Sequence, residues 1–187
     1  MSALPTRYSP GMRIVVSGTH ASGKSTLITD FAALRPDYEV LPDPFEALEE
    51  TAFDLDAGIF FAQLVIASER LRGRPPGDRV IAERGPLDFL AYLRALDDLG
   101  RPTRSAGLYD RGTAITAEAM TRVDLLVLLP LHHHDPITVG ADEDPELRAA
   151  TDAALLELAD DPSLTGAARI VELAGARKDR LARLLEA

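Results

Sequence analysis

The sequence predicts an α/β fold with a mostly parallel five-stranded sheet, and two observations support this. Five short apolar runs are spaced along the 187 residues, and helix-forming segments lie between them. Parallel strands need such crossover segments, and helices on both faces of a sheet let its strands be almost continuously apolar. The predicted strands are residues 13–17, 38–42, 79–83, 124–130 and 169–173.

Helices are expected where apolar residues recur at helical spacing between turn signals. Segment 23–35 ends near Pro36, and segment 56–72 ends before the turn cluster "GRPPGD". Segment 145–159 begins with a proline, whose missing N–H costs nothing at that position. The remaining helices are expected at 45–51, 87–99, 116–123 and 177–186.

Composition limits the classes of function. A net charge of −10 argues against binding a nucleic-acid backbone. The sequence has no cysteine, which excludes disulfides and thiolate metal sites, and no apolar run is long enough to span a bilayer. We therefore expect a cytoplasmic protein that binds neither nucleic acid nor membrane. It should have one domain at 13–187 after a flexible leader at 1–12.

The stretch "GTHASGKS" after the first predicted strand matches the phosphate-binding pattern G-x-x-x-x-G-K-[ST] without a mismatch. It also leads into a helix, whose N-terminus attracts anions together with the backbone N–H groups of the loop. Lys24 is expected to reach the β- and γ-phosphates, and the Ser25 hydroxyl to help hold Mg²⁺. The predicted nucleotide-binding residues are Gly18, His20, Ala21, Ser22, Gly23, Lys24, Ser25 and Thr26.

Charged residues follow two of the other predicted strands. Glu83 ends the third strand and is the candidate carboxylate for Mg²⁺, while Arg84 is placed to stabilise a phosphoryl group in transfer. Asp43 follows the second strand, where a carboxylate can accept the proton of an attacking hydroxyl; Glu46 is the alternative base. A surface Glu–Arg pair and an ordinary Asp-Pro turn are the structural alternatives.

Gln63 is the only glutamine of the chain and lies in the apolar helix "GIFFAQLVIASERL". A buried carboxamide without a partner is costly, so we expect this side chain to pair with the edge of a nucleobase. Phe60, Phe61 or Phe53 would then flank the base. The alternative is a glutamine on the solvent face of the helix, and Arg70 on the same helix is most simply a surface residue.

In order along the chain, "GTHASGKST", "PDPFEAL", "FFAQLVIASERL" and "ERGPLDFLAYL" resemble segments of the P-loop nucleoside and nucleotide kinases. The closest resemblance is to the bacterial AAA-type small ATP-binding kinases. It implies a P-loop NTPase three-layer sandwich, with Asp43 as general base and Gln63 as the base-reading amide. It also places Glu83 and Arg84 in a Glu-Arg-Ser motif.

Three positions depart from that family pattern. Asp43 is a shorter acid than the family's glutamate, Ala62 stands where an aromatic residue precedes the glutamine, and Gly85 replaces the serine.

The lid of these kinases is a further departure. The resemblance implies an arginine-rich lid after the fourth strand, but the lid-like segment 131–148 has three histidines and several acids before its first arginine. That residue, Arg148, is either the lid arginine or a surface residue. Adjacent histidines in an extended loop point in different directions, so we expect His132–His134 to form a polar or pH-sensitive loop, not a metal site. Gly175 and Arg177 follow the fifth strand, where small kinases bind adenine; a plain helix start is the alternative.

Together these features predict an Mg²⁺-ATP-dependent phosphotransferase that acts on a small acceptor, most simply a nucleoside or nucleotide. The residues expected to carry catalysis are Lys24, Glu83, Arg84, Asp43 and Arg148. Those expected to bind the acceptor are Asp43, Phe60, Gln63 and Arg84. The absence of asparagine excludes the guanine-reading N-K-x-D motif of switch GTPases. An ATP-binding regulatory module without a small acceptor and a kinase of a non-nucleoside alcohol remain open. Apolar residues at 57–67 suggest a homodimer.

Overall fold

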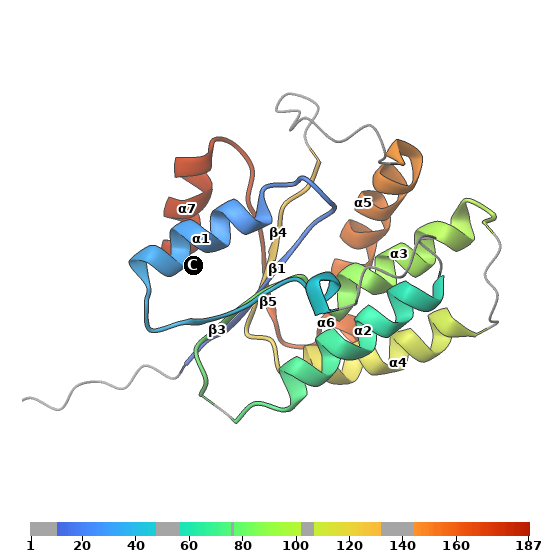
Figure 1. Cartoon of the computed structure of the whole chain (residues 1–187), viewed down its shortest axis with the longest axis horizontal. Coiled ribbons are helices and arrows are strands. Elements are labelled where there is room, and N and C mark those ends of the chain that lie inside the picture. Colours follow the sequence, from blue (N-terminus) through green and yellow to red (C-terminus); the bar gives the residue numbers. More distant parts are fainter. Residues whose placement is uncertain (1–10, 48–56, 76, 102–106, 132–143) are drawn as a thin grey trace, which may run out of the picture.

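The computed structural model describes residues 11–47, 57–75, 77–101, 107–131 and 144–187. Its centre is a sheet of five strands in the order β2-β3-β1-β4-β5, and every pairing is parallel (Figure 1). The predicted sheet is therefore confirmed and is wholly parallel. The strands are β1 (Arg13–Ser17), β2 (Glu39–Leu41), β3 (Val80–Glu83), β4 (Leu125–Leu128) and β5 (Arg169–Glu172).

Helices cover both faces of the sheet and form a three-layer α/β/α arrangement. Helices α1 (Lys24–Leu34) and α7 (Arg177–Glu186) lie on one face. The larger group on the opposite face consists of α2 (Ala57–Arg72), α3 (Pro86–Asp98), α4 (Leu108–Met120), α5 (Pro145–Ala159) and α6 (Pro162–Thr165). A short 3-10 helix, η1 (Pro44–Ala47), follows β2. No described helix is both long and apolar enough to cross a membrane.

The strands separate two apolar cores because successive side chains point to opposite faces. On β1, Ile14 and Val16 pack with Phe31 of α1 on one side. Val15 packs with Leu64 of α2 and Leu90 of α3 on the other. All five residues of β1 are buried, which agrees with its central place in the sheet.

Most predicted elements form close to their expected bounds. Helix α4 is the main difference, since it begins at Leu108 and not near residue 116. Gly107 precedes it with φ of 76°, a left-handed conformation that suits glycine, so the helix begins directly after a glycine. The short helix α6, with the Asp161 side chain accepting a hydrogen bond from the Ser163 N–H, was not predicted.

The strand order determines where a ligand site can form. The chain passes from β1 to β2 and β3 on one side of the sheet and then to β4 on the other, so β1 lies at the point where the order reverses. Ligands of open parallel sheets bind beyond the carboxyl ends of the strands at such a point.

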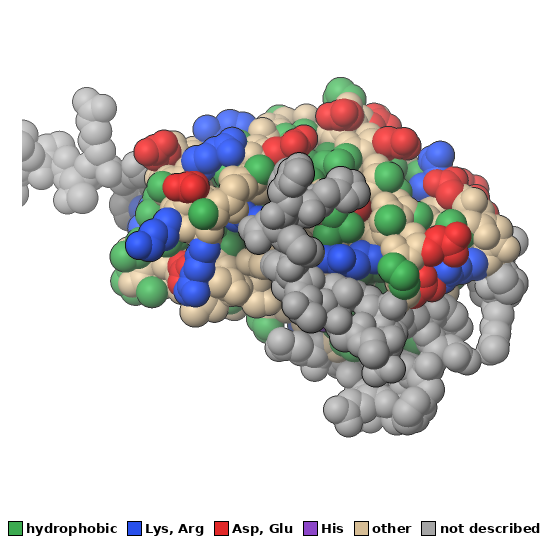
Figure 2. All heavy atoms as spheres, turned by 90° about the horizontal axis from the view of Figure 1, so that it is seen from above, with side chains coloured by type: hydrophobic (Ala, Val, Ile, Leu, Met, Phe, Trp, Pro, Cys, Tyr) green, Lys and Arg blue, Asp and Glu red, His purple; other side chains and the backbone are tan. Residues whose placement is uncertain are grey.

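Over the described part of one face, acidic and basic side chains are interspersed (Figure 2).

Candidate active site

The phosphate loop connects β1 to α1 through a segment that includes residues with positive φ before the helix. Gly23 precedes α1 with φ of 92°, and Ala21 has φ of 51°, which is unusual for a residue with a side chain. A Cβ on Gly18 would lie 2.7 Å from Ser22 Oγ and 2.9 Å from the Leu129 carbonyl oxygen, so only glycine fits there. The loop has the geometry of an anion-binding site.

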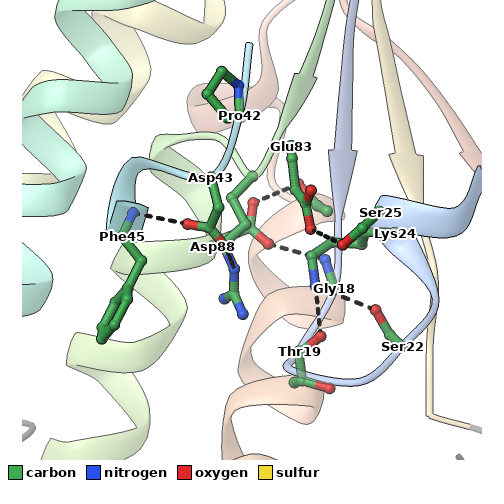
Figure 3. Close-up of polar contacts among 12 residues, drawn as sticks. Gly18, Thr19, Ser22, Lys24, Ser25, Pro42, Asp43, Phe45, Glu83 and Asp88 are labelled. Atoms are coloured by element: carbon green, nitrogen blue, oxygen red, sulfur yellow. Dashed lines mark hydrogen bonds and ion pairs between the residues drawn. The ribbon is translucent and has the colours of Figure 1, made fainter. Parts of the chain in front are cut away.

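Lys24 lies beneath this loop and is buried. Its Nζ donates to the Thr19 carbonyl oxygen at 2.7 Å and to Ser22 Oγ at 3.4 Å (Figure 3). Burial lowers the pKa of Lys24 from 10.5 to about 8, and nearby Arg84 adds to this, while Asp88, Glu83 and Asp43 oppose it. Phosphate groups would supply the negative charge that favours the protonated ammonium.

Arginines from two helices bind the outer side of the loop. Arg148 Nε of α5 donates to the His20 carbonyl oxygen at 3.0 Å, and its Nη2 donates to that of Ala21 at 3.4 Å. Arg180 Nη1 of α7 donates to the Ser22 carbonyl oxygen at 3.1 Å. These contacts occupy the carbonyl groups of three successive loop residues and so fix the loop conformation. The sequence analysis named Arg148 as a lid or surface residue and not for this contact, its catalytic role stays a prediction, and Arg180 was missed.

Ser25 and Glu83 bring a hydroxyl and a carboxylate together next to the loop. Ser25 Oγ, at the start of α1, donates to Glu83 Oε1, at the end of β3, at 2.7 Å. A hydroxyl and a carboxylate suit Mg²⁺, which usually takes one or two protein ligands and completes its shell with water and phosphate oxygens. The donor set fits Mg²⁺ bound together with ATP.

Asp43 and Arg84 are brought together from the ends of β2 and β3. Arg84 Nε donates to Asp43 Oδ2 at 2.7 Å, and the arginine side chain is 8% exposed. Burial acts to lower the pKa of Arg84, but Tyr92, Asp43 and Asp88 outweigh it and raise that pKa above its ordinary value. Arg84 also has φ of 63°, a left-handed conformation that costs about 1–2 kcal/mol. Strain of this kind is typical of functional positions.

Asp88 was not predicted from sequence, although it connects the end of β1 with the turn after β3. Its carboxylate accepts hydrogen bonds from Ser17 Oγ at 2.6 Å, the Gly18 N–H at 2.9 Å and the Gly85 N–H at 2.8 Å. Burial raises the pKa of Asp88, while Arg84 and the three donors oppose the increase. The sequence signal that could have identified Asp88 is an acid at the third position of a helix, where its side chain can cap the N-terminus.

The glycine that replaces the motif's serine has a packing reason. A Cβ on Gly85 would lie 2.7 Å from Val15 Cγ1, and Val15 is fully buried at the centre of the sheet. Since Gly85 has an extended backbone, with φ of −119° and ψ of −178°, the lack of space and not the conformation favours glycine.

Gln63 is fully buried in α2, and both atoms of its amide have no hydrogen-bond partner in the part of the chain that the structure describes. This excludes the alternative of a solvent-facing glutamine. One turn earlier, the Phe60 ring stacks on Tyr92 with centroids 4.4 Å apart, and Tyr92 in turn accepts a hydrogen bond from Arg84 Nη1 at 3.4 Å. Phe60 is 3% exposed. These contacts connect the helix of Gln63 to the Asp43–Arg84 pair.

The other predicted site residues have the following places. His20, Ser25 and Thr26 are exposed on the loop and the first turn of α1, and Gly175 has φ of 95° in the turn before α7. Arg177 forms an ion pair with Asp30 of α1, with both N–O distances at 2.6 Å. Its role at adenine stays a prediction. Phe53, His132–His134 and the leader at 1–10 lie outside the described residues, and only the ends of segment 131–148 are described.

This combination of phosphate loop, Ser–Glu pair and parallel sheet defines a P-loop nucleotide-binding protein. A model of the AAA domain family matches residues 13–180, so the chain belongs to that family. None of the curated proteins matches the sequence.

Solved structures of two kinases are among those similar in fold. Thymidylate kinase from Candida albicans has 19% identity and a TM-score of 0.66 over 95% of this chain and 90% of that one. Deoxyadenosine kinase from M. mycoides, determined with bound dATP, has 15% identity and a TM-score of 0.68 over 94% of this chain and 98% of that one. The predicted resemblance to P-loop nucleoside and nucleotide kinases is thus confirmed at the level of fold.

Proposed function

We propose that the protein is an Mg²⁺-ATP-dependent phosphotransferase that moves the γ-phosphoryl group to a nucleoside or nucleotide. The observation that carries the proposal is the Asp43–Arg84 pair beside the phosphate loop, with N–O distance 2.7 Å. Asp43 is held at this place by Arg84 and by the Phe45 N–H at 3.0 Å, where its carboxylate can take the proton of an attacking hydroxyl. The kinases that share the fold add support.

The residues divide the chemistry among them. The loop amides and Lys24 bind the β- and γ-phosphates, and Ser25 with Glu83 would hold Mg²⁺, which neutralises charge on the phosphates when bound. An acceptor oxygen attacks the γ-phosphorus, and the bond from that phosphorus to the β–γ bridging oxygen breaks, so ADP leaves with the electron pair. Asp43 takes the proton of an acceptor hydroxyl. Arg84 stabilises charge on the phosphoryl group in transfer.

Gln63 is the residue proposed to select the acceptor. Its amide offers two donors and one acceptor, and burying them unpaired is unfavourable unless a ligand pairs with them. A nucleobase edge presents such groups side by side. Phe60 stacks on Tyr92 and so supports the helix that carries Gln63. Arg148 would contribute by holding the phosphate loop through its hydrogen bond to the His20 carbonyl oxygen.

A second candidate is an ATP-binding or slowly hydrolysing module without a small acceptor. It is favoured by the lid-like segment, because residues 131–147 contain no arginine. A kinase of a non-nucleoside alcohol, such as a sugar or natural product, is the third possibility. The homodimer and the cytoplasmic location stay predictions. The apolar residues of α2 that suggested a dimer are largely buried within the chain itself.

The test measures ADP release from Mg²⁺-ATP alone and with nucleosides, deoxynucleosides and their monophosphates. Stimulation by a member of this panel is expected, and it should disappear in Lys24→Ala. A basal rate that no nucleoside or nucleotide raises would contradict the proposal and favour the module or the kinase of another alcohol. Adding sugar and natural-product alcohols to the same assay separates those two.

A further inference from the structure

We infer that the acceptor is an unphosphorylated nucleoside, whose hydroxyl group attacks ATP, and not a nucleoside monophosphate. This inference rests on the proposed function and specifies the substrate class of the same site. Three features of the described residues support it. They are the carboxylate of Asp43 next to Arg84, the partners that the nearby arginines already have, and the neutral amide of Gln63.

The first feature is the position of Asp43. A hydroxyl group must lose its proton as it attacks phosphorus, so a carboxylate beside it assists the reaction. A phosphate monoester has a second pKa near 6, so at neutral pH its attacking oxygen already lacks a proton. For such an acceptor Asp43 would have no proton to remove and would repel the incoming dianion. The carboxylate is therefore useful for a hydroxyl acceptor and unfavourable for a phosphate.

The second feature is that the positive charge of Arg84 is already paired with the carboxylate of Asp43. Its guanidinium donates to Asp43 at 2.7 Å and to Tyr92, and both side chains of the ion pair are largely buried, at 8% and 18% exposure. Arg84 can stabilise the phosphoryl group in transfer from its place in this pair. Moving it away to bind an acceptor phosphate would leave Asp43 without its partner in this buried place, which is strongly unfavourable.

The other arginines of this region that the structure describes also have partners. Arg70 Nη1 donates to the Pro42 carbonyl oxygen at 2.8 Å, and Arg111 lies over the Phe61 ring at 4.9 Å. Arg148 and Arg180 bind carbonyl groups of the phosphate loop. None of these arrangements presents a cluster of cations to a second phosphate on the acceptor side.

The third feature is the chemistry of the acceptor helix. Gln63 is fully buried and neutral, and it lies near Phe60 and Leu64 in an apolar core. A neutral heteroaromatic edge can pair with this amide without bringing charge into the core. Among hydroxyl acceptors this favours a nucleoside over a plain sugar, which has no such edge.

The experiment compares matched pairs of acceptors with the whole protein and Mg²⁺-ATP. Each pair consists of a nucleoside and its 5′-monophosphate: deoxyadenosine and dAMP, deoxycytidine and dCMP, deoxyguanosine and dGMP, thymidine and dTMP, and the four ribonucleoside pairs. ADP release gives kcat/KM, and mass spectrometry identifies the phosphorylated product. In the pair that is used best, the nucleoside should exceed its monophosphate by about 100-fold or more in kcat/KM, because the monophosphate meets an unfavourable like charge.

A monophosphate that is used as well as its nucleoside, or better, would overturn the inference while leaving the proposed kinase intact. If ATP binds but no member of any pair is phosphorylated, the proposed function itself fails. The two failures are therefore distinguishable.

A pair of variants tests the role of the carboxylate directly. Asp43→Asn keeps the shape of the side chain and removes the base, so kcat with the nucleoside should fall about 100- to 10,000-fold with little change in ATP affinity. Asp98→Asn is the matched control, because Asp98 forms an exposed ion pair with Arg94 on α3. An Asp43→Asn variant that keeps full activity on the nucleoside would overturn the role given to this acid.

Discussion

The two halves of the candidate site are built in different ways. The phosphate half is one continuous segment, Gly18–Ser25, which acts largely through backbone N–H groups. The acceptor half is assembled from side chains of separate elements: Asp43 after β2, Gln63 in α2 and Arg84 after β3. A local segment can bind ATP whatever the acceptor is, whereas acceptor choice depends on tertiary packing. Changes in one half should therefore leave the function of the other half largely intact.

Within the phosphate half, the largest effect is expected from Lys24→Ala. Lys24 is the buried cation of the loop segment itself, and its loss removes charge stabilisation of the γ-phosphate. Phosphotransfer should fall about 1,000-fold, the upper range for loss of one such electrostatic group. Lys178→Ala is the matched control, since Lys178 is the only other lysine and is exposed on α7. Equal activity of the two variants would contradict the assigned role.

Asp88→Asn should impair both halves of the site, because the Asp88 carboxylate accepts hydrogen bonds from both. Its carboxylate accepts from Gly18 of the phosphate loop and from Gly85 next to Arg84. The asparagine loses the charge and turns an NH₂ group toward N–H donors, which should cost about 1–3 kcal/mol of stability. ATP affinity and kcat should both fall about tenfold.

Asp97→Asn, an exposed change on the same helix, is the control for Asp88→Asn. If Asp88→Asn lowered the melting temperature but left both kinetic parameters unchanged, Asp88 would only stabilise the fold. Because Asp88 also raises the pKa of Lys24, its loss should shift the alkaline decline of ATP affinity to lower pH. A purely structural residue would not cause that shift.

Gln63→Leu sharpens the comparison from the acceptor side. The buried amide has no partner in the described structure, so an apolar side chain of similar size should stabilise the free protein by about 1–2 kcal/mol. The same change removes the pairing with the base and should raise the KM for the nucleoside about tenfold or more. The KM for ATP should not change. Thermal unfolding and acceptor titrations measure the two effects.

Loss of stability in Gln63→Leu would show that the amide has a partner in the free protein. An unchanged acceptor KM would show that it does not read the base. A gain in stability with a loss of acceptor binding is the pattern expected where function is maintained at the expense of stability.

The same contrast explains how much of the site could be predicted from the sequence. The strands and the loop around Lys24 follow from local patterns, and the pairing of Ser25 with Glu83 follows from the rule that strand ends meet at one edge of the sheet. Asp88 and Arg180 could not be identified in this way. Each lies within an ordinary helical pattern, and its role in the site depends on contacts with Gly18 or Ser22, which are remote in sequence.

The smallest expected effect is the pH dependence of ATP affinity, which isolates the phosphate half. The pKa of Lys24 in the free protein is lowered to about 8 by burial, and bound phosphates favour the charged form. The ammonium is therefore largely present below pH 7, and affinity should fall as pH rises through 8. Near pH 8, binding should take up about half a proton, which calorimetry in buffers of different ionisation enthalpy measures. Lys24→Arg keeps its charge and should show no uptake; an equal uptake in both proteins would assign the proton to another group.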